Sequence, residues 1–143
     1  MSELRSVLAA ARGERRNALT EAEAYLVAGA LGLAVPEHRV VPMGGPVPSL
    51  DGLPGQEVVV KVLAPGVAHK TERGGTAAVR RDPAAVAGAI DVMAARFAHE
   101  PVLGWLVAEW VGHEPRPGGE VLVGWRRTAE FGPVLVLGVG GVY

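Results

Sequence analysis

The chain has 143 residues, 49% of them hydrophobic, and a formal net charge of −1, which fits one compact domain or one large subdomain. The near-neutral charge predicts neither a nucleic-acid nor a membrane partner, and the absence of cysteine excludes a disulfide frame, a thiolate nucleophile and a cysteine metal site. We see no signal-peptide pattern and no run near the roughly 20 apolar residues of a membrane span, so we expect a cytoplasmic protein.

The first predicted element is a helix. Residues 1–18 are rich in Arg and Ala, and we interpret them as a frayed helix or a linker from an upstream domain. Thr20 can then cap a helix, with Glu23 placed to complete a capping box, and this helix is expected to run to about Leu31. We therefore divide the chain into an extension, 1–18, and a folded part, 19–143.

The remaining elements interleave strands with one further helix. Pro83 after Asp82 marks a helix start, and Val86, Ile90, Met93 and Phe97 give that helix one apolar face, which we assign to the core. We expect the strands 105–111 and 120–127 to pair as a hairpin. The predicted strands are 39–41, 57–63, 76–80, 105–111, 120–127 and 133–137. This order predicts an α+β fold with a mainly antiparallel sheet.

Lysine is used at only two places in this chain. Of 14 basic residues, only Lys61 and Lys70 are lysines, and the rest are arginines. Heavy use of Ala, Gly, Val, Arg and Pro is typical of GC-rich coding, which disfavours lysine. We interpret the two lysines as compact ammonium groups directed at phosphate, a task in which arginine is not equivalent. Chance clustering is the alternative.

A first candidate site combines Lys61 with the loop that follows its strand. A lysine within a buried valine run must leave the core or meet an anion, because burying an unpaired charge is costly. The loop offers groups that suit a phosphate chain: His69, Lys70, Thr71, Gly74 and Gly75. The spacing of a Walker A loop is absent. An outward-facing Lys61 and an ordinary polar turn stay open alternatives, and Glu72 and Arg73 are interpreted as solvated charges.

A second candidate site consists of two glutamates. Glu109 and Glu120 belong to the predicted hairpin, and we expect their side chains on the same side as Lys61. They could act as an acid/base pair, or accept hydrogen bonds from an amino group and sugar hydroxyls; strand-end surface positions are the alternative. No metal site is predicted, because the remaining histidines lack partners at ligand spacing: His38, His99 and His113.

Several segments also follow one another in a recognisable order. They are Leu19-Thr20-Glu21-x-Glu23, Val60-Lys61-Val62, Pro65-x-x-x-His69-Lys70-Thr71-Glu72-x-Gly74-Gly75, Ala108-Glu109-Trp110-Val111, Gly119-Glu120-Val121-Leu122-Val123-Gly124, Arg127-x-x-x-Phe131-Gly132-Pro133 and Gly138-Val139-Gly140-Gly141. This order resembles the ATP-grasp domain of ADP-forming acetyl-CoA synthetases and related NDP-forming acyl-CoA synthetases. The chain departs from the family pattern at Ala64, at Thr128-Ala129 and in a long loop, 113–118.

The resemblance implies the first lobe of an ATP-grasp fold, with ATP or ADP held against a second lobe. By position, Lys61 resembles the lysine that contacts the nucleotide phosphates, and we expect Lys70 and Thr71 to add donors to the same phosphates. His69 resembles the histidine that receives phosphate during its relay. The remaining implied contacts are Gly74 and Gly75 as a phosphate-covering turn, Glu109 and Gly112 as the adenine hinge, and Glu120 as the ribose acceptor.

The resemblance also implies parts that we expect outside this chain. We expect the chain to be truncated before the second lobe, because Gly138 to Gly141 should continue into further structure. The Mg²⁺ ligands and the CoA-binding domain or subunit would then lie elsewhere, and the isolated chain should be inactive. A second copy could cover the exposed inner face as a homodimer.

Three functions follow from this pattern. The first is an ADP-forming acyl-CoA synthetase, converting acid, CoA and ATP into acyl-CoA, ADP and phosphate through a phosphohistidine. The second is a synthetase-like regulatory region of a protein lysine acetyltransferase that senses a ligand without turnover. The third is a succinyl-CoA synthetase β-type lobe, against which the His-Lys-Thr loop argues.

Overall fold

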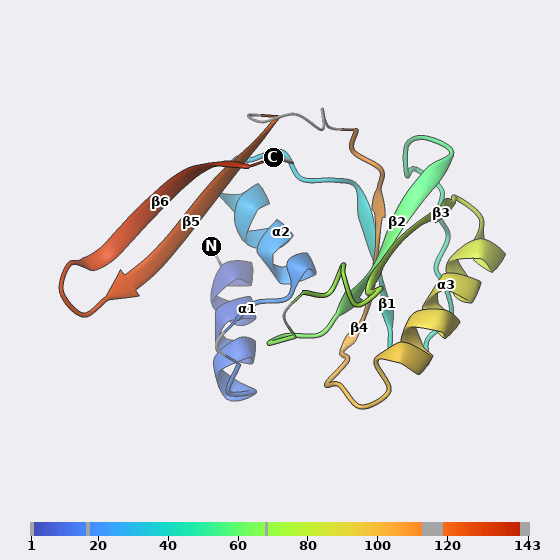
Figure 1. The fold of residues 1–143 in the computed structure, drawn as a ribbon, viewed down its shortest axis with the longest axis horizontal. Helices are drawn as coiled ribbons and strands as arrows, with labels where there is room; N and C mark the ends of the chain where they lie inside the picture. Colours follow the sequence, from blue (N-terminus) through green and yellow to red (C-terminus); the bar gives the residue numbers. More distant parts are fainter. Residues whose placement is uncertain (1, 17, 68, 113–118, 141–143) are drawn as a thin grey trace. The chain divides into compact units, whose positions relative to one another are not determined.

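The computed structural model describes residues 2–16, 18–67, 69–112 and 119–140 (Figure 1). The chain divides into two compact units, Met1–Trp110 and Val111–Tyr143. In order, the elements are α1 (Ser2–Gly13), α2 (Glu21–Ala30), β1 (His38–Pro42), β2 (Glu57–Leu63), β3 (Thr76–Arg80), α3 (Pro83–Arg96), β4 (Gly104–Glu109), β5 (Glu120–Thr128) and β6 (Gly132–Gly140). The segment interpreted as a frayed helix or a linker thus contains a regular helix, α1.

The first unit is built on a four-stranded sheet of order β1-β4-β2-β3. All three pairings are antiparallel, which confirms the predicted α+β class with a mainly antiparallel sheet. The two central strands are the most apolar, because each has its neighbours on both sides and α-helices over its faces. Figure 1 shows α3 on one side of this sheet and α1 and α2 on the other.

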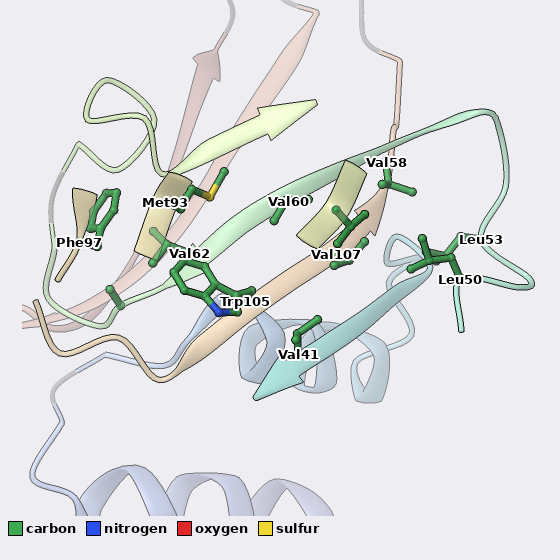
Figure 2. Packing of buried hydrophobic residues seen from close by; sticks show 12 residues of the cluster. Val41, Leu50, Leu53, Val58, Val60, Val62, Met93, Phe97, Trp105 and Val107 are labelled. Carbon is green, nitrogen blue, oxygen red and sulfur yellow. The ribbon is translucent and has the colours of Figure 1, made fainter. Parts of the chain in front are cut away.

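The larger core lies between the sheet and α3. Alternate residues of β2 point to this side, because successive side chains of a strand face opposite ways. The predicted apolar face of α3 is confirmed, since Val86, Met93 and Phe97 are at most 2% exposed. Figure 2 shows Met93 and Phe97 beside the strands. The cluster also includes Val41, Val58, Val60, Val62, Trp105 and Val107.

The opposite face of the sheet has a smaller apolar cluster. Its buried members are Leu63, Leu106 and Ala108, and two residues of α2, Ala22 and Tyr25, pack against them. Helix α2 therefore covers the part of this face formed by β4 and the end of β2. The part along β3 is left open, and there Ala78 and Arg80 are exposed.

Helix α2 starts as its sequence predicts. The Thr20 hydroxyl accepts from the Glu23 amide at 3.2 Å, and the Glu23 carboxylate accepts from the Thr20 amide at 2.7 Å, which completes the capping box. Arg16 then donates two hydrogen bonds to the Glu23 carboxylate, at 2.7 and 2.8 Å. The guanidinium group lowers the pKa of Glu23 to about 2, so this carboxylate stays charged and ties the end of the N-terminal segment to α2.

The second unit contains a two-stranded antiparallel hairpin of β5 and β6. The predicted hairpin of 105–111 with 120–127 is wrong. Strand β4 pairs with β1 on one edge and β2 on the other, so it has no edge left for β5. Strand β5 instead pairs with β6 across the short loop 129–131. Such a connection costs less entropy to close than the longer segment between β4 and β5.

No helix in the described part of the chain is long and apolar enough to cross a membrane.

Candidate functional site

Lys61 lies in the middle of β2 and pairs with a carboxylate of α2. Its Nζ donates to Oε1 of Glu21 at 2.6 Å, and the two side chains are 29% and 32% exposed. Tyr25 donates its hydroxyl to the same oxygen at 2.8 Å. The anion that we expected beside this lysine is therefore the Glu21 carboxylate of the protein itself. The Lys61 side chain lies on the α2 side of the sheet.

The loop after β2 brings a hydroxyl group to the same side. Thr76 is the cross-strand partner of Lys61, and directly paired residues share one face of an antiparallel sheet. The Thr76 hydroxyl lies 3.4 Å from the hydroxyl of Thr71. Thr71 is thus close to the Lys61 face. Lys70 precedes it with a half-buried side chain, which makes no ion pair with any described residue.

The two loop glycines close the base of the loop rather than face Lys61. Gly74 donates its amide to the Thr71 carbonyl at 3.0 Å, and Gly75 donates to the Lys70 carbonyl at 2.7 Å. A Cβ at Gly75 would lie 2.7 Å from a methyl group of Val62, which belongs to the α3 side. In this conformation both N–H groups are used inside the loop, so a phosphate-covering role requires the turn to open.

His69 occupies an exposed position with an unusual backbone. Its φ of 54° lies in the left-handed region, which costs energy for a residue with a side chain. Its Nδ1 lies 3.3 Å from the carboxylate of Glu72. In a neutral imidazole this contact favours the tautomer with the proton on Nδ1, and Nε2 is then the nitrogen whose lone pair can act as a nucleophile.

Arg73 anchors the loop to the end of α3. It forms an ion pair with Glu100, and its guanidinium carbon lies 5.1 Å from the ring centre of Phe97. The Arg73 side chain is 43% exposed, which agrees with its interpretation as a solvated charge, and its planar guanidinium also contacts a carboxylate and an aromatic ring. The sequence contains no signal for this contact, since its partners lie more than 20 residues away.

The prediction that Glu109 shares a face with Lys61 is wrong. Lys61 pairs with Leu106 in the β2–β4 register, so Leu106 and Ala108 lie on the Lys61 side. Glu109 pairs with Val58, whose side chain is in the α3 core, and it therefore belongs to the opposite side. Its amide donates to the carbonyl of Glu37 at 2.8 Å. The predicted proximity of two glutamates depended on a hairpin that does not form.

The two remaining predicted residues lie in the second unit. Gly112 and Glu120 are both exposed, and Glu120 begins β5 opposite Gly140. Their predicted contacts with the hinge and the ribose remain predictions. His113, which we expected in a surface loop, lies outside the described residues.

A pocket at the start of β2 was not foreseen from the sequence. It has a volume of about 600 Å³ and is lined by Gly55, Gln56, Glu57, Arg80, Arg81 and Trp110. Glu57 and Arg80 are cross-strand partners, and Glu57 lies on the same face as Lys61 because alternate residues of a strand face the same way. The pocket therefore reaches the open side of the sheet on which Lys61 lies. Flat guanidinium and indole groups are suited to stacking on a planar ring.

Within the residues that the structure describes, no group of three or more His, Asp or Glu side chains could hold a metal ion. Three carboxylates of the Lys61 strand, its loop and their contacts already have partners within the protein. Glu21 binds Lys61, Glu72 lies beside His69, and Glu100 binds Arg73.

The fold and the site together define a class of protein: an α+β lobe with an antiparallel sheet that presents one lysine and a polar loop on an open face. A family model described as an ATP-grasp domain matches residues 10–143, and the chain belongs to this family. The match begins within α1, while the predicted boundary at residue 18 remains a prediction.

The relatives are named as ADP-forming CoA ligases. The chain is 29% identical, over its full length and 61% of the relative, to the acetate–CoA ligase (ADP-forming) I subunit beta of Pyrococcus furiosus. It is also 29% identical to the 4-hydroxybutyrate–CoA ligase (ADP-forming) of Nitrosopumilus maritimus, covering 91% of the chain but 19% of that protein. The chain thus spans less than two thirds of the length of these relatives.

Solved structures of an acetyl-coenzyme A synthetase from Ca. Korarchaeum cryptofilum show the same fold. One, in complex with coenzyme A and Ca-AMPCP, matches with a TM-score of 0.72 and 27% identity, over 96% of the chain and 60% of that structure. Another, with coenzyme A and Mg-AMPPCP, has its phosphohistidine segment pointing towards the nucleotide binding site. It matches with a TM-score of 0.63 and 25% identity, over 97% of the chain and 58% of that structure.

Proposed function

We propose that this chain is the nucleotide-binding lobe of an ADP-forming acyl-CoA synthetase. The parent reaction converts a carboxylic acid, CoA and ATP into acyl-CoA, ADP and phosphate, or runs in reverse. Membership of the ATP-grasp family and the names of the relatives support this choice. The 4-hydroxybutyrate and acetate ligases differ in their acid, so the proposal stays with acyl groups in general.

The observation that carries the proposal is a line of suitable groups along one face of the sheet. Lys61 lies opposite its cross-strand partner Thr76, Thr71 lies next to Thr76, and the pocket beside Trp110 lies at the other end of β2. Glu57 lies four positions before Lys61 in β2, which corresponds to roughly 13 Å of extended strand. That length suits an extended nucleotide, with phosphates towards the loop and a planar base towards the pocket.

Each group on this face then has a distinct task. Lys61 donates to the phosphates, and Lys70 and Thr71 add donors once the loop closes over them. The main chain at Glu109 and Gly112 is assigned to the adenine hinge. Glu120 of the hairpin would accept a ribose hydroxyl. The Mg²⁺ ligands and the CoA-binding domain are proposed to lie outside this chain. The parent enzyme is proposed to be cytoplasmic and able to form a homodimer.

His69 would carry the phosphoryl group between catalytic centres. Its Nε2 attacks the transferred phosphorus, the bond from phosphorus to the donor oxygen breaks, and that oxygen leaves with the electron pair. Glu72 would stabilise the proton on Nδ1 while this occurs. The His69 side chain is 72% exposed and lies in a loop, which supports a role in carrying phosphate between two catalytic centres.

Amide chemical shifts of the ¹⁵N-labelled chain during titration with Mg-ADP provide the test. We expect the amide chemical shifts to change along β2, β3 and the loop 69–76. In Lys61→Ala these changes should be much smaller at the same Mg-ADP concentration. Arg12→Ala on α1 is the matched control for removing a positive charge. Shifts confined to α3, or an unchanged titration in Lys61→Ala, would contradict the proposal. Assays for ATP formation from acyl-CoA, ADP and phosphate should show no turnover by the isolated chain.

A further inference from the structure

We propose that Glu21 is the positioning residue that holds the Lys61 ammonium group ready for the phosphates, an inference that rests on the proposed function. The two residues are 40 positions apart, and no sequence spacing predicts their contact. Their ion pair links the first residue of α2 to the middle of β2.

Glu21 is itself held by the start of α2 and by Tyr25. It is the first residue of α2, where the positive end of the helix favours a carboxylate. One turn later, Tyr25 donates its hydroxyl to the same Oε1 that binds Lys61. Burial and this carboxylate both raise the pKa of Tyr25, so the phenol keeps the proton that it donates. The helix start is fixed in turn by the capping box of Thr20 and Glu23.

The ion pair with Glu21 uses only part of the hydrogen-bonding capacity of the Lys61 ammonium group. An ammonium group has three N–H donors, and Glu21 accepts one of them. The other two have no acceptor among the described residues, and they are the donors proposed for phosphate oxygens on the open side of the sheet. A long side chain that is already fixed loses less entropy on binding than a free one, and immobilising it would otherwise reduce affinity. Glu21 thus acts on the nucleotide through Lys61, without touching it.

The presence of only two lysines makes the contact directly measurable. In a chain labelled with ¹⁵N-lysine, the Nζ signals of Lys61 and Lys70 can be assigned with Lys70→Arg. We expect Lys61 to show restricted motion and slow hydrogen exchange, and Lys70 to show neither. Glu21→Ala should make Lys61 as mobile as Lys70. A wild-type Lys61 that is already that mobile would overturn the inference.

The affinity for Mg-ADP tests whether Glu21 positions Lys61 or has another role. We expect Glu21→Ala to weaken Mg-ADP binding by about 3- to 10-fold, as for one long side chain that must be immobilised. Glu21→Gln keeps an oxygen that accepts from Lys61 and Tyr25, so it should restore most of the affinity. Tighter binding by either variant would overturn the inference, because Glu21 would then compete with phosphate.

One control variant and one wild-type measurement distinguish a failure of the inference from a failure of the proposed function. Glu23→Gln weakens the start of α2 without touching Lys61, so it should leave the Lys61 signal ordered. If it disorders Lys61 as much as Glu21→Ala does, Glu21 serves only the helix and the inference fails. If wild-type Lys61 is ordered but does not respond to Mg-ADP, the proposed function fails, and the role of Glu21 in binding fails with it.

Discussion

Gly75 occupies a position where the backbone of the loop meets the core. A Cβ there would lie 2.7 Å from a Val62 methyl group, 2.9 Å from the Lys70 carbonyl oxygen and 2.9 Å from the Phe97 ring. Two of these atoms belong to buried side chains that cannot move aside freely. The residue is therefore a packing requirement in this conformation, whatever its part in binding phosphate.

Gly75→Ala is expected to lower the free energy of unfolding by about 1–3 kcal/mol, the usual range for overpacking a filled core. Gly88→Ala is the matched control, because nothing lies within 4 Å of a Cβ at that position on α3. That change should stabilise the protein by about 0.5–1 kcal/mol through helix propensity. Urea unfolding of both variants is the measurement, and equal stability of the two would contradict the packing argument.

The Arg16–Glu23 pair predicts a specific dependence of stability on pH. The pKa of Glu23 falls from 4.5 to about 2 on folding, so the unfolded state binds more protons between these values. The contribution of Glu23 is complete above about pH 4.5 and is lost as the pH falls through 2. Glu23→Gln should cost about 1–2 kcal/mol at pH 7 and less at pH 3.

Urea midpoints at the two pH values measure this effect. Asp91→Asn on the exposed side of α3 is the control, since it removes a carboxylate that makes no ion pair with a described residue. If Glu23→Gln costs the same at pH 3 as at pH 7, the ion pair does not supply the stability.

At the scale of elements, local patterns predicted the helices and strands but not all of their neighbours. The capping box, the Asp82-Pro83 helix start and the valine run of β2 each depend on adjacent residues. Strand pairing depends on which edges remain free. The sequence does not show that β4 lies between β1 and β2, and this central position removed the predicted hairpin and placed Glu109 on the other face.

The same limit applies to the candidate site. Lys61 could be predicted because a charge within an apolar strand is unusual, and the loop because its residue types suit phosphate. Glu21, Arg73 and the pocket at Trp110 could not, since each depends on segments brought together only by the fold.

The anchored loop gives a prediction for the segment between β2 and β3. Arg73→Ala removes both the ion pair with Glu100 and the contact with Phe97. We expect the global stability to change by less than about 1 kcal/mol, because both groups are partly exposed. The Gly75 amide, which donates to Lys70, should exchange its hydrogen about tenfold faster.

Hydrogen exchange followed by NMR is the measurement, with Arg12→Ala as the control for loss of an arginine. Unchanged exchange at Gly75 would show that the glycine turn holds the loop without Arg73.

At the scale of the whole molecule, the two units differ in how they bury apolar surface. Both hydrophobic clusters consist of residues from Met1–Trp110. The hairpin exposes apolar side chains from both strands: Val121, Leu122, Val123, Leu135, Leu137 and Val139. A two-stranded hairpin is at best marginally stable by itself in water.

We therefore expect the amides of β5 and β6 to exchange much faster than those of β2 and β4. Exchange followed by mass spectrometry on the isolated chain would show this difference. Protection of β5 and β6 equal to that of β2 would mean that a second copy or another surface covers the hairpin. Dilution distinguishes these outcomes, because only an assembly of copies loses protection at low concentration.

The central place of β4 in the sheet also determines the order in which the lobe can fold on the ribosome. Strands β2 and β3 pair across a single loop, so they can associate soon after they emerge. Strand β1 emerges earlier, but among the described strands it pairs only with β4, where Val40 pairs with Leu106 near the end of the first unit. Until β4 has been synthesised, the backbone groups of β1 have no strand partner, and the apolar side chain of Val41 stays outside the core. The slow step of folding should therefore be the insertion of β4, and this interval is when a nascent chain most needs protection from aggregation.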